Sequence, residues 1–335
     1  MTGIRTLQKI QMGRETTAGT AVVATTLWRG LGVPEDGLEL VYPDENIGVL
    51  AAGDRAYIPK LQGKFKFASV EATFEQLLHI FEAGIKTVGT GVTDTGGSGK
   101  VYAYPMTTTV PNTIKTYTLE GGDNAGVERI EYAYVDSFSI DGKAGEALMV
   151  EADWIGRQVT TTAGWTPNVV APSVEEILFT PGRFYLDAIG GTIGTTQVSN
   201  TLLEMSVKVK TGWTARWTAN GLGKYFGYTR LTGPEVSLDL KFEHNSTAVA
   251  EKAYWRAATS RLARLEFPGT ALTTAGTYTT KLLRLDFCGK WEKVSGLDDD
   301  DGNDILTFTM KPKYNSTAAK FFDVTVVTNG LATVP

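Results

Sequence analysis

Two histidines and one cysteine are the side chains of this 335-residue sequence best suited to catalysis or to transition-metal binding near neutral pH. His79 lies within an apolar helical pattern, and His244 stands next to Asn245 where a predicted strand meets a predicted helix. Neither histidine belongs to an HExxH, GxSxG or CxxC motif. The lone Cys288 excludes an internal disulfide and a thiolate metal cage. We therefore predict no catalytic residues, no cofactor and no metal site, and a chain that is not an enzyme.

An acidic run at 298–304 (DDDDGND) is the strongest pattern for a metal site. Aligning Gly302 with the glycine of an EF-hand loop places Leu297 at the first ligand position and Phe308 at the twelfth, and neither residue can bind calcium. A solvated hairpin tip explains the run, because clustered like charges favour exposure to water. A cation site of another kind remains open. The glycine-rich segment Gly96–Lys100 lacks the Ser or Thr that follows the lysine of a phosphate-binding loop.

Two tryptophans, Trp213 and Trp217, are four residues apart around a Thr-rich predicted strand. They suit either a stacking platform for a sugar or packing in a core or interface, and packing is the interpretation we favour.

The composition favours a β-rich globular protein. Hydrophobic residues make up 42% and charged residues 21%, which is enough apolar side chain for a sizeable core. The sequence contains 46 Thr and 37 Gly, residue types that favour strands and turns. No apolar run is long enough for a membrane helix, and the first residues contain no apolar core of a secretion signal. The net charge of −5 argues against a protein whose main task is to bind the nucleic acid backbone.

The first half of the chain has a recognisable order of elements. Residues 1–50 are polar and rich in glycine, and we predict an extended arm or loop that belongs to the first domain. Apolar residues spaced at Phe74, Leu77, Leu78, Phe81 and Ile85 predict an amphipathic helix, followed by a Gly/Thr-rich loop over 87–100. Strands are predicted over residues 64–73, 113–119, 127–140 and 146–155, with a hairpin turn at Asp141-Gly142.

The second half repeats this order. Asn245, Ser246 and Thr247 are candidate N-caps of a helix whose stripe is Trp255, Ala258, Leu262 and Leu265. Strands are predicted over 184–189, 201–209, 213–218, 236–242, 281–287, 290–294, 305–311 and 321–327. We therefore divide the chain into the arm at 1–50, a first domain core at 51–160, a linker at 161–172 and a second domain at 173–335. An internal duplication explains the shared order, although two unrelated units remain possible.

Charge divides unevenly between these halves. Residues 1–172 contain 20 acidic and 14 basic residues, whereas residues 173–335 contain 17 acidic and 18 basic ones. Such asymmetry suits head-to-tail contacts between unlike surfaces.

Several segments carry a resemblance to a known family. The run Gly13–Gly30 (GRETTAGTAVVATTLWRG), the segment Tyr42–Gly48 (YPDENIG) and the stretch Tyr117–Asn124 (YTLEGGDN) occur in the order and spacing typical of it, as do Val135–Ile140 and Trp154–Arg157. In these features the chain resembles the tail tube, or major tail, proteins of long-tailed, non-contractile bacteriophages.

The resemblance implies a mainly β fold with minor α content: two tandem tail-tube-type β-sandwich or half-barrel domains, each with one flanking helix. It implies a structural virion protein that self-assembles through sheet-edge contacts into stacked rings. Two tube domains per chain would make a ring of three chains, a homotrimer that is a pseudo-hexamer. The ring would enclose an acidic and polar channel through which DNA passes during ejection.

The same resemblance implies the location and the partners of the protein. The location would be the tail of the virion, after synthesis in the cytoplasm of the bacterial host. The partners would be further copies of the chain, the tape measure protein and the tail terminator and tip proteins, with DNA only in transit and no membrane. We expect the arm at 13–50 and the loop at 87–100 to contact the neighbouring ring. The alternative function is a β-sandwich binding module, carbohydrate-binding or adhesin-like.

Overall fold

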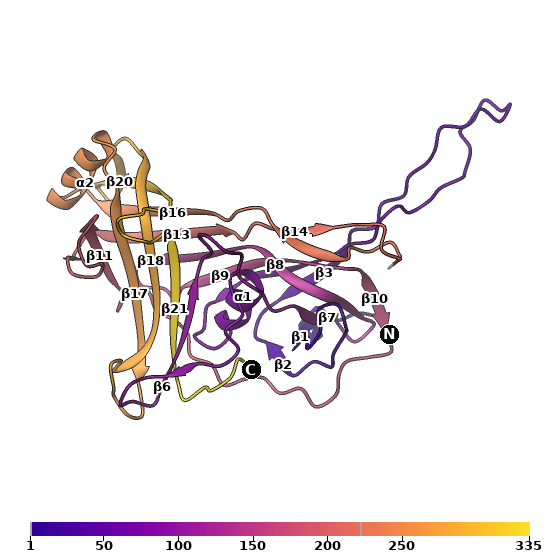
Figure 1. The fold of residues 1–335 in the computed structure, drawn as a ribbon, viewed down its shortest axis with the longest axis horizontal. Helices are drawn as coiled ribbons and strands as arrows, with labels where there is room; N and C mark the ends of the chain where they lie inside the picture. The colour runs from indigo at the N-terminus through magenta and orange to yellow at the C-terminus, as the bar shows by residue number, and fades with distance from the viewer. Residues whose placement is uncertain (1, 222) are drawn as a thin grey trace.

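A computed structural model describes residues 2–221 and 223–335 of the chain, and strands dominate it (Figure 1). The prediction of a mainly β protein with minor α content is confirmed. The elements of the first half are η1 (Arg5–Leu7), β1 (Lys9–Arg14), β2 (Thr26–Trp28), β3 (Gly32–Asp36), β4 (Gly63–Glu71), α1 (Leu77–Gly84), β5 (Val92–Thr93), β6 (Gly99–Pro105), β7 (Tyr117–Gly122), β8 (Val127–Lys143), β9 (Met149–Gly156) and β10 (Val159–Thr162).

The second half has a similar succession of elements around one helix. They are β11 (Arg183–Ala188), β12 (Gln197–Val198), β13 (Leu202–Lys210), β14 (Trp213–Arg216), β15 (Tyr228–Leu231), β16 (Glu235–Glu243), α2 (Ser246–Arg256), β17 (Arg261–Ala271), β18 (Thr280–Val294), β19 (Asp298–Asp300), β20 (Asn303–Pro312) and β21 (Phe322–Asn329).

One continuous antiparallel sheet runs through both halves, and we call it the long sheet. Its strand order is β3, β4, β9, β8, β13, β16, β20 and finally the C-terminal part of β18 with β19. Successive side chains of a strand point to opposite faces, so alternating sequences such as KFKF in β4 bury one face and expose the other. Phe65 and Phe67 of β4 are therefore buried, whereas Lys64 and Lys66 lie on the polar face.

A second layer covers the buried face in each half. In the first half it contains β2, β1, β7, the N-terminal part of β8 and β10. In the second half it contains β12, β11, β17, the N-terminal part of β18, β21, β6 and β5. The long strands β8 and β18 pass from one layer into the other, and they pair with strands of both layers. The core between the layers is aromatic, with Phe67 packed against Trp28 and Trp154 at centroid distances of 4.9 and 5.2 Å.

The strand pairings of the two halves follow one pattern. The pairs β1–β2, β1–β7, β7–β8, β8–β10, β8–β9, β9–β4 and β4–β3 recur as β11–β12, β11–β17, β17–β18, β18–β21, β18–β20, β20–β16 and β16–β13.

The correspondence extends to single residues and to a bulge. The β8–β9 ladder shifts register between Val135 and Ser137, and the β18–β20 ladder shifts between Trp291 and Lys293, each 156 positions later. Reading across the strands, the row Pro34–Phe65–Trp154–Val135 corresponds to the row Val207–Leu238–Met310–Trp291.

Two pairings join the halves to each other. The C-terminal part of β8 pairs with β13 over Ser137–Lys143 and Glu204–Lys210, so the long sheet crosses from one half to the other without interruption. In the second layer, β6 of the first half pairs with β21 over seven residues. The halves are therefore integrated by backbone hydrogen bonds in both layers.

The structure differs from the sequence predictions at the N-terminus. Within the expected arm at 1–50, β1, β2 and β3 are paired strands, and Ile10 and Met12 of β1 are fully buried. The segment that projects from the body is 37–62, the loop between β3 and β4, seen at the upper right of Figure 1. The apolar residues of the short strands β1 and β2 are separated by polar residues, so the sequence pattern alone does not indicate that these segments are buried.

Other boundaries also differ. Asp141-Gly142 is not a turn, because β8 continues to Lys143 where pairing with β13 holds it extended. The helix begins as predicted, with Asn245 accepting hydrogen bonds from the backbone of Thr247 and Ala248, but it ends at Arg256. Leu262 and Leu265 instead lie on β17, a strand buried on both faces whose apolar run resembles a helical stripe. In the expected linker at 161–172, β10 extends to Thr162. Elsewhere, β6 lies between the loop predicted over 87–100 and the strand predicted over 113–119.

Candidate functional site

His79 is part of the protein interior. It lies on α1, all of whose residues are buried, and its Nδ1 is 3.1 Å from the Tyr117 hydroxyl. Burial, together with the positive charge of Arg14, lowers the pKa of His79 to about 3. Arg14 forms an ion pair with Glu82 at 2.7 Å. A neutral, enclosed imidazole of this kind supports packing and has no access to a substrate.

The remaining chemistry-bearing residues are also dispersed. His244 is exposed before α2, and Cys288 is buried on β18, where desolvation raises the pKa of its thiol. The acidic run at 298–304 lies at the exposed β19–β20 hairpin. Within residues 2–221 and 223–335, no group of three or more His, Cys, Asp or Glu side chains is arranged to hold a metal ion.

The two tryptophans do not form a platform. Trp213 is 7% exposed, and its indole N–H donates to the Gly84 carbonyl at the end of α1. Trp217 is 37% exposed and packs edge-on against Phe226, with the ammonium of Lys60 5.8 Å from its ring. Both therefore serve to pack the β14–β15 hairpin against the body and the base of the projecting loop.

The junction between β8 and β13 has regular antiparallel geometry. Seven residue pairs run from Glu204–Lys143 to Lys210–Ser137. At its ends, the Ala144 N–H donates to the Leu203 carbonyl, and the Thr211 N–H donates to the Asp136 carbonyl. Odd-numbered residues of β13 therefore direct their backbone groups toward β8, because backbone direction alternates along a strand.

The long sheet ends in two open edges, on opposite sides. β3 pairs with β4 and, among the strands that the structure describes, with no other. At the far end, Lys290–Val294 of β18 and then β19 pair with β20 on one side and leave the other side free of strands, again within the described part of the chain. Open edges present unsatisfied N–H and C=O groups and are templates for pairing with another chain.

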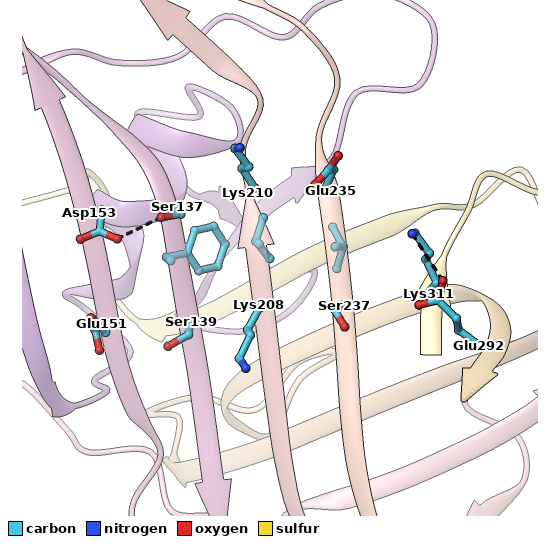
Figure 2. A pocket seen from close by; sticks show the side chains of 13 residues that line it. Ser137, Ser139, Glu151, Asp153, Lys208, Lys210, Glu235, Ser237, Glu292 and Lys311 are labelled. Carbon is cyan, nitrogen blue, oxygen red and sulfur yellow. Dashed lines mark hydrogen bonds and ion pairs between the residues drawn. The ribbon is translucent and has the colours of Figure 1, made fainter. Parts of the chain in front are cut away.

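The polar face of the long sheet is hollowed around the junction. A groove of about 450 Å³ lies there. Figure 2 shows side chains of both charge signs lining it from neighbouring strands. Its charged lining consists of Glu151, Asp153, Lys208, Lys210, Glu235, Glu292 and Lys311. The Asp153 carboxylate accepts a hydrogen bond from Ser137 at 3.1 Å. The groove is a stretch of open sheet surface, without the convergent polar groups of an enclosed binding site.

Two connections project from the same end of the long sheet. The loop at 37–62 joins β3 to β4, and the segment 211–234 with the β14–β15 hairpin joins β13 to β16, the corresponding strands of the second half (Figure 1). They touch where the Leu61 N–H, at the base of the loop, donates to the Lys224 carbonyl in the connection between β14 and β15. The loop at 37–62 exposes apolar side chains along its length: Leu38, Leu40, Tyr42, Ile47, Val49, Leu50 and Tyr57.

Sequence reasoning missed two residues with structural roles: Glu15 within the first half, and Arg157, which joins the first half to the segment 211–234 of the second. Glu15 is buried, accepts hydrogen bonds from Thr116, Thr118 and the Tyr132 backbone, and has its pKa raised by burial. Arg157 donates to three backbone carbonyls and lies 4.6 Å from the Tyr132 ring. Both residues lie in segments that carry the family resemblance, but no local pattern identifies their partners.

Neither α1 nor α2, the α-helices of the described residues, has the length of apolar sequence that a bilayer-spanning helix requires. A scan against models of protein families finds no match to the chain, and a search among curated proteins finds none either.

Proposed function

We propose that the protein is a structural virion protein that assembles into stacked rings, forming the tail tube of a long-tailed, non-contractile bacteriophage. The observation that carries the proposal is the β8–β13 junction together with the two open edges. Within the chain, β13 of the second half pairs with β8 of the first half. The long sheet then ends in two open edges that correspond to these partners: β3 corresponds to β13, and the end of β18 corresponds to β8. Repeating such a contact head to tail closes a ring.

Three chains make the proposed ring. The recurring pairings support two tandem tube domains of the sandwich or half-barrel type, each with its own helix, and three chains then supply six domains. A closed barrel of 24 strands, spaced about 4.8 Å apart and tilted by about 40°, is about 50 Å across between opposite backbones. Side chains that extend about 5 Å from each wall leave a lumen about 40 Å wide, which admits duplex DNA.

The polar face of the long sheet lines the lumen in this proposal. Sheet residues alternate faces, so the face opposite the core is the one available to line a channel. Rows of lysines and carboxylates alternate there, so a passing phosphate meets attraction and repulsion in turn within a Debye length of about 8 Å. The expected lumen was acidic and polar; with these lysines a polar wall of balanced charge fits the proposal better, and such a wall does not retain DNA.

Axial contacts between rings fall to the projecting connections. The loop at 37–62 carries exposed apolar side chains that require a partner surface, and a neighbouring ring supplies one. The Gly/Thr-rich loop at 87–100 remains the second candidate. The tape measure, terminator and tip proteins are the further partners, and the tail of the virion is the location.

Electron microscopy of the purified protein tests the function directly. Negative-stain images at several protein concentrations should show rings with three-fold or pseudo-six-fold symmetry, and tubes at the highest concentrations. Rings of six chains would refute the trimer while preserving the tube. A monodisperse monomer at every concentration would refute the tube and favour the binding module.

A further inference from the structure

The internal junction specifies the register of the contact between chains. We propose that β3 of one copy pairs antiparallel with the β18–β19 edge of the next copy, with Glu35 opposite Ser295. This inference rests on the proposed ring, and it identifies the residues by which a second copy is recognised.

The correspondence between the halves fixes these partners. Pro34 holds the place of Val207, so Glu35 corresponds to Lys208. Ser139 and Ser295 also correspond, because they are 156 positions apart, as the two bulges are. Their partners correspond as well: Ser139 lies opposite Glu151, and the Ser295 N–H donates to the Thr307 carbonyl, 156 positions after Glu151. Within the chain, Lys208 pairs with Ser139. The equivalent pair between chains is Glu35 with Ser295.

Backbone direction at the two edges agrees with this pairing. The Ala68 N–H donates to the Leu31 carbonyl and the Gly37 N–H to the Gln62 carbonyl, so odd-numbered residues of β3 face β4 and even-numbered ones face outward. On the other edge, the Ser295 N–H donates to Thr307, so Val294 and Gly296 face outward. Glu35 and Ser295 therefore form a pair without mutual backbone bonds, with Cα atoms about 4.5 Å apart.

Charges at one end of the proposed contact are complementary. β3 exposes Glu35 and Asp36, and β18 exposes Lys293; in the proposed register the exposed Asp298 and Asp299 of β19 lie at the other end, opposite Gly32 and Leu31. In the proposed register, Lys293 lies opposite Gly37 and diagonally adjacent to Glu35, within reach of a long side chain. Neither Glu35 nor Lys293 has an ion-pair partner among the residues that the structure describes.

Apolar residues around the two helices point to the same contact. Thr211 and Trp213 cover the C-terminal end of α1 and are 0% and 7% exposed. Their counterparts four and six residues after Pro34 are Leu38 and Leu40, which are 42% and 50% exposed.

The helix that these leucines would cover is itself uncovered. All of α1 is buried, whereas α2 buries only Ala248 and Glu251 among its residues and exposes Val249 and Tyr254. In the proposed register, the leucines of one copy reach the C-terminal end of α2 in the next copy, as Thr211 and Trp213 reach α1 within the chain.

Disulfide cross-linking tests the register. The variant carrying Glu35→Cys and Ser295→Cys, oxidised with copper phenanthroline, should give covalent dimers and trimers on a non-reducing gel, because a 4.5 Å Cα separation suits a disulfide. The pair Ser139→Cys and Lys208→Cys is the positive control and should cross-link within one chain. The pair Leu31→Cys and Ser295→Cys is the matched negative control, since Leu31, the residue before β3, lies four residues, about 13 Å, from Glu35 along the chain.

Micrographs of each variant separate the two levels of the proposal. Rings with the Glu35–Ser295 cross-link support the register. Rings in which only the Leu31 pair cross-links, or neither pair does, overturn the register and leave the tube intact. The absence of rings from the wild-type chain, together with the absence of intermolecular cross-links, overturns both.

Discussion

Replacing Pro34 by valine should strengthen ring closure. Pro34 lies in the middle of the open β3 edge, and its backbone nitrogen faces outward without a hydrogen to donate. Val207 occupies the corresponding place in β13 and directs its N–H toward Ile140 of β8. A proline on an edge strand blunts unwanted pairing, so the proposed contact between wild-type chains should be weaker than the internal junction.

The size of the effect follows from one hydrogen bond per contact. A backbone hydrogen bond contributes a net of about 1 kcal/mol, or about fivefold in the association constant. A ring of three chains contains three such contacts, so the P34V ring should gain about 3 kcal/mol, or about a hundredfold in its equilibrium constant. Loss of proline also frees the unfolded chain and lowers folding stability by about 0.4–1 kcal/mol, which acts on the monomer and not on association.

Sedimentation velocity across a concentration series at fixed salt measures this shift. The matched variant is V207P, which removes the same N–H from the internal junction and leaves the Ile140 carbonyl unsatisfied. It should lower the free energy of unfolding by about 1–3 kcal/mol or more. If P34V folds normally but assembles no better than wild type, β3 is not the edge that closes the ring.

Three further predictions concern stability and stacking. Glu251→Gln should cost about 3–5 kcal/mol in urea unfolding, because Glu251 is 2% exposed and accepts two bonds from Arg261, at 2.7 and 3.1 Å. The double variant E251L/R261M should recover only part of that loss, because the Trp291 indole N–H, which donates to Glu251 at 2.8 Å, also loses its acceptor. A cost of E251Q below about 1 kcal/mol would contradict the argument. His79 binds a proton near pH 6.5 in the unfolded chain but only near pH 3 in the folded protein. The contribution of His79 to the free energy of unfolding should therefore be complete above pH 6.5 and decrease at lower pH by about 1.4 kcal/mol per pH unit. The variant His79→Gln should flatten this acid-side slope in pH-dependent unfolding, and an unchanged slope would show that other groups cause it. Replacing residues 44–55 with a short Gly-Ser linker should leave rings intact in micrographs but prevent stacking, whereas normal tubes would exclude the loop at 37–62 from axial contacts.

Strands with strict alternation were predictable from the sequence. Phe65 and Phe67 alternate with lysines in β4, and the pattern alone places both phenylalanines in a core. The capping of α2 by Asn245 was equally readable, because asparagine before a helical pattern satisfies free backbone N–H groups. The end of that helix was not, since β17 is buried on both faces and its apolar run has no strand periodicity.

The candidate site was only partly predictable, because pairing between distant strands leaves no local signal. The sequence order suggested a repeat, but the junction depends on Ser137–Lys143 meeting Glu204–Lys210, which only the fold reveals. The turn predicted at Asp141-Gly142 failed for the same reason. A dipeptide that favours a turn remains extended there because β13 lies beside it.

The pairing of β6, a strand of the first half, with β21 of the second half has a consequence for biosynthesis. Asn329 of β21 lies opposite Gly99 of β6, so the ribosome adds more than 200 residues after β6 before its partner exists. Contacts of such sequence separation form slowly, and until then the edge of β6 that pairs with β21 stays open, with only β5 on its other side. Chaperones that shield nascent chains should therefore bind arrested fragments lacking β21 in preference to the finished polypeptide, which would keep unfinished molecules out of the proposed rings.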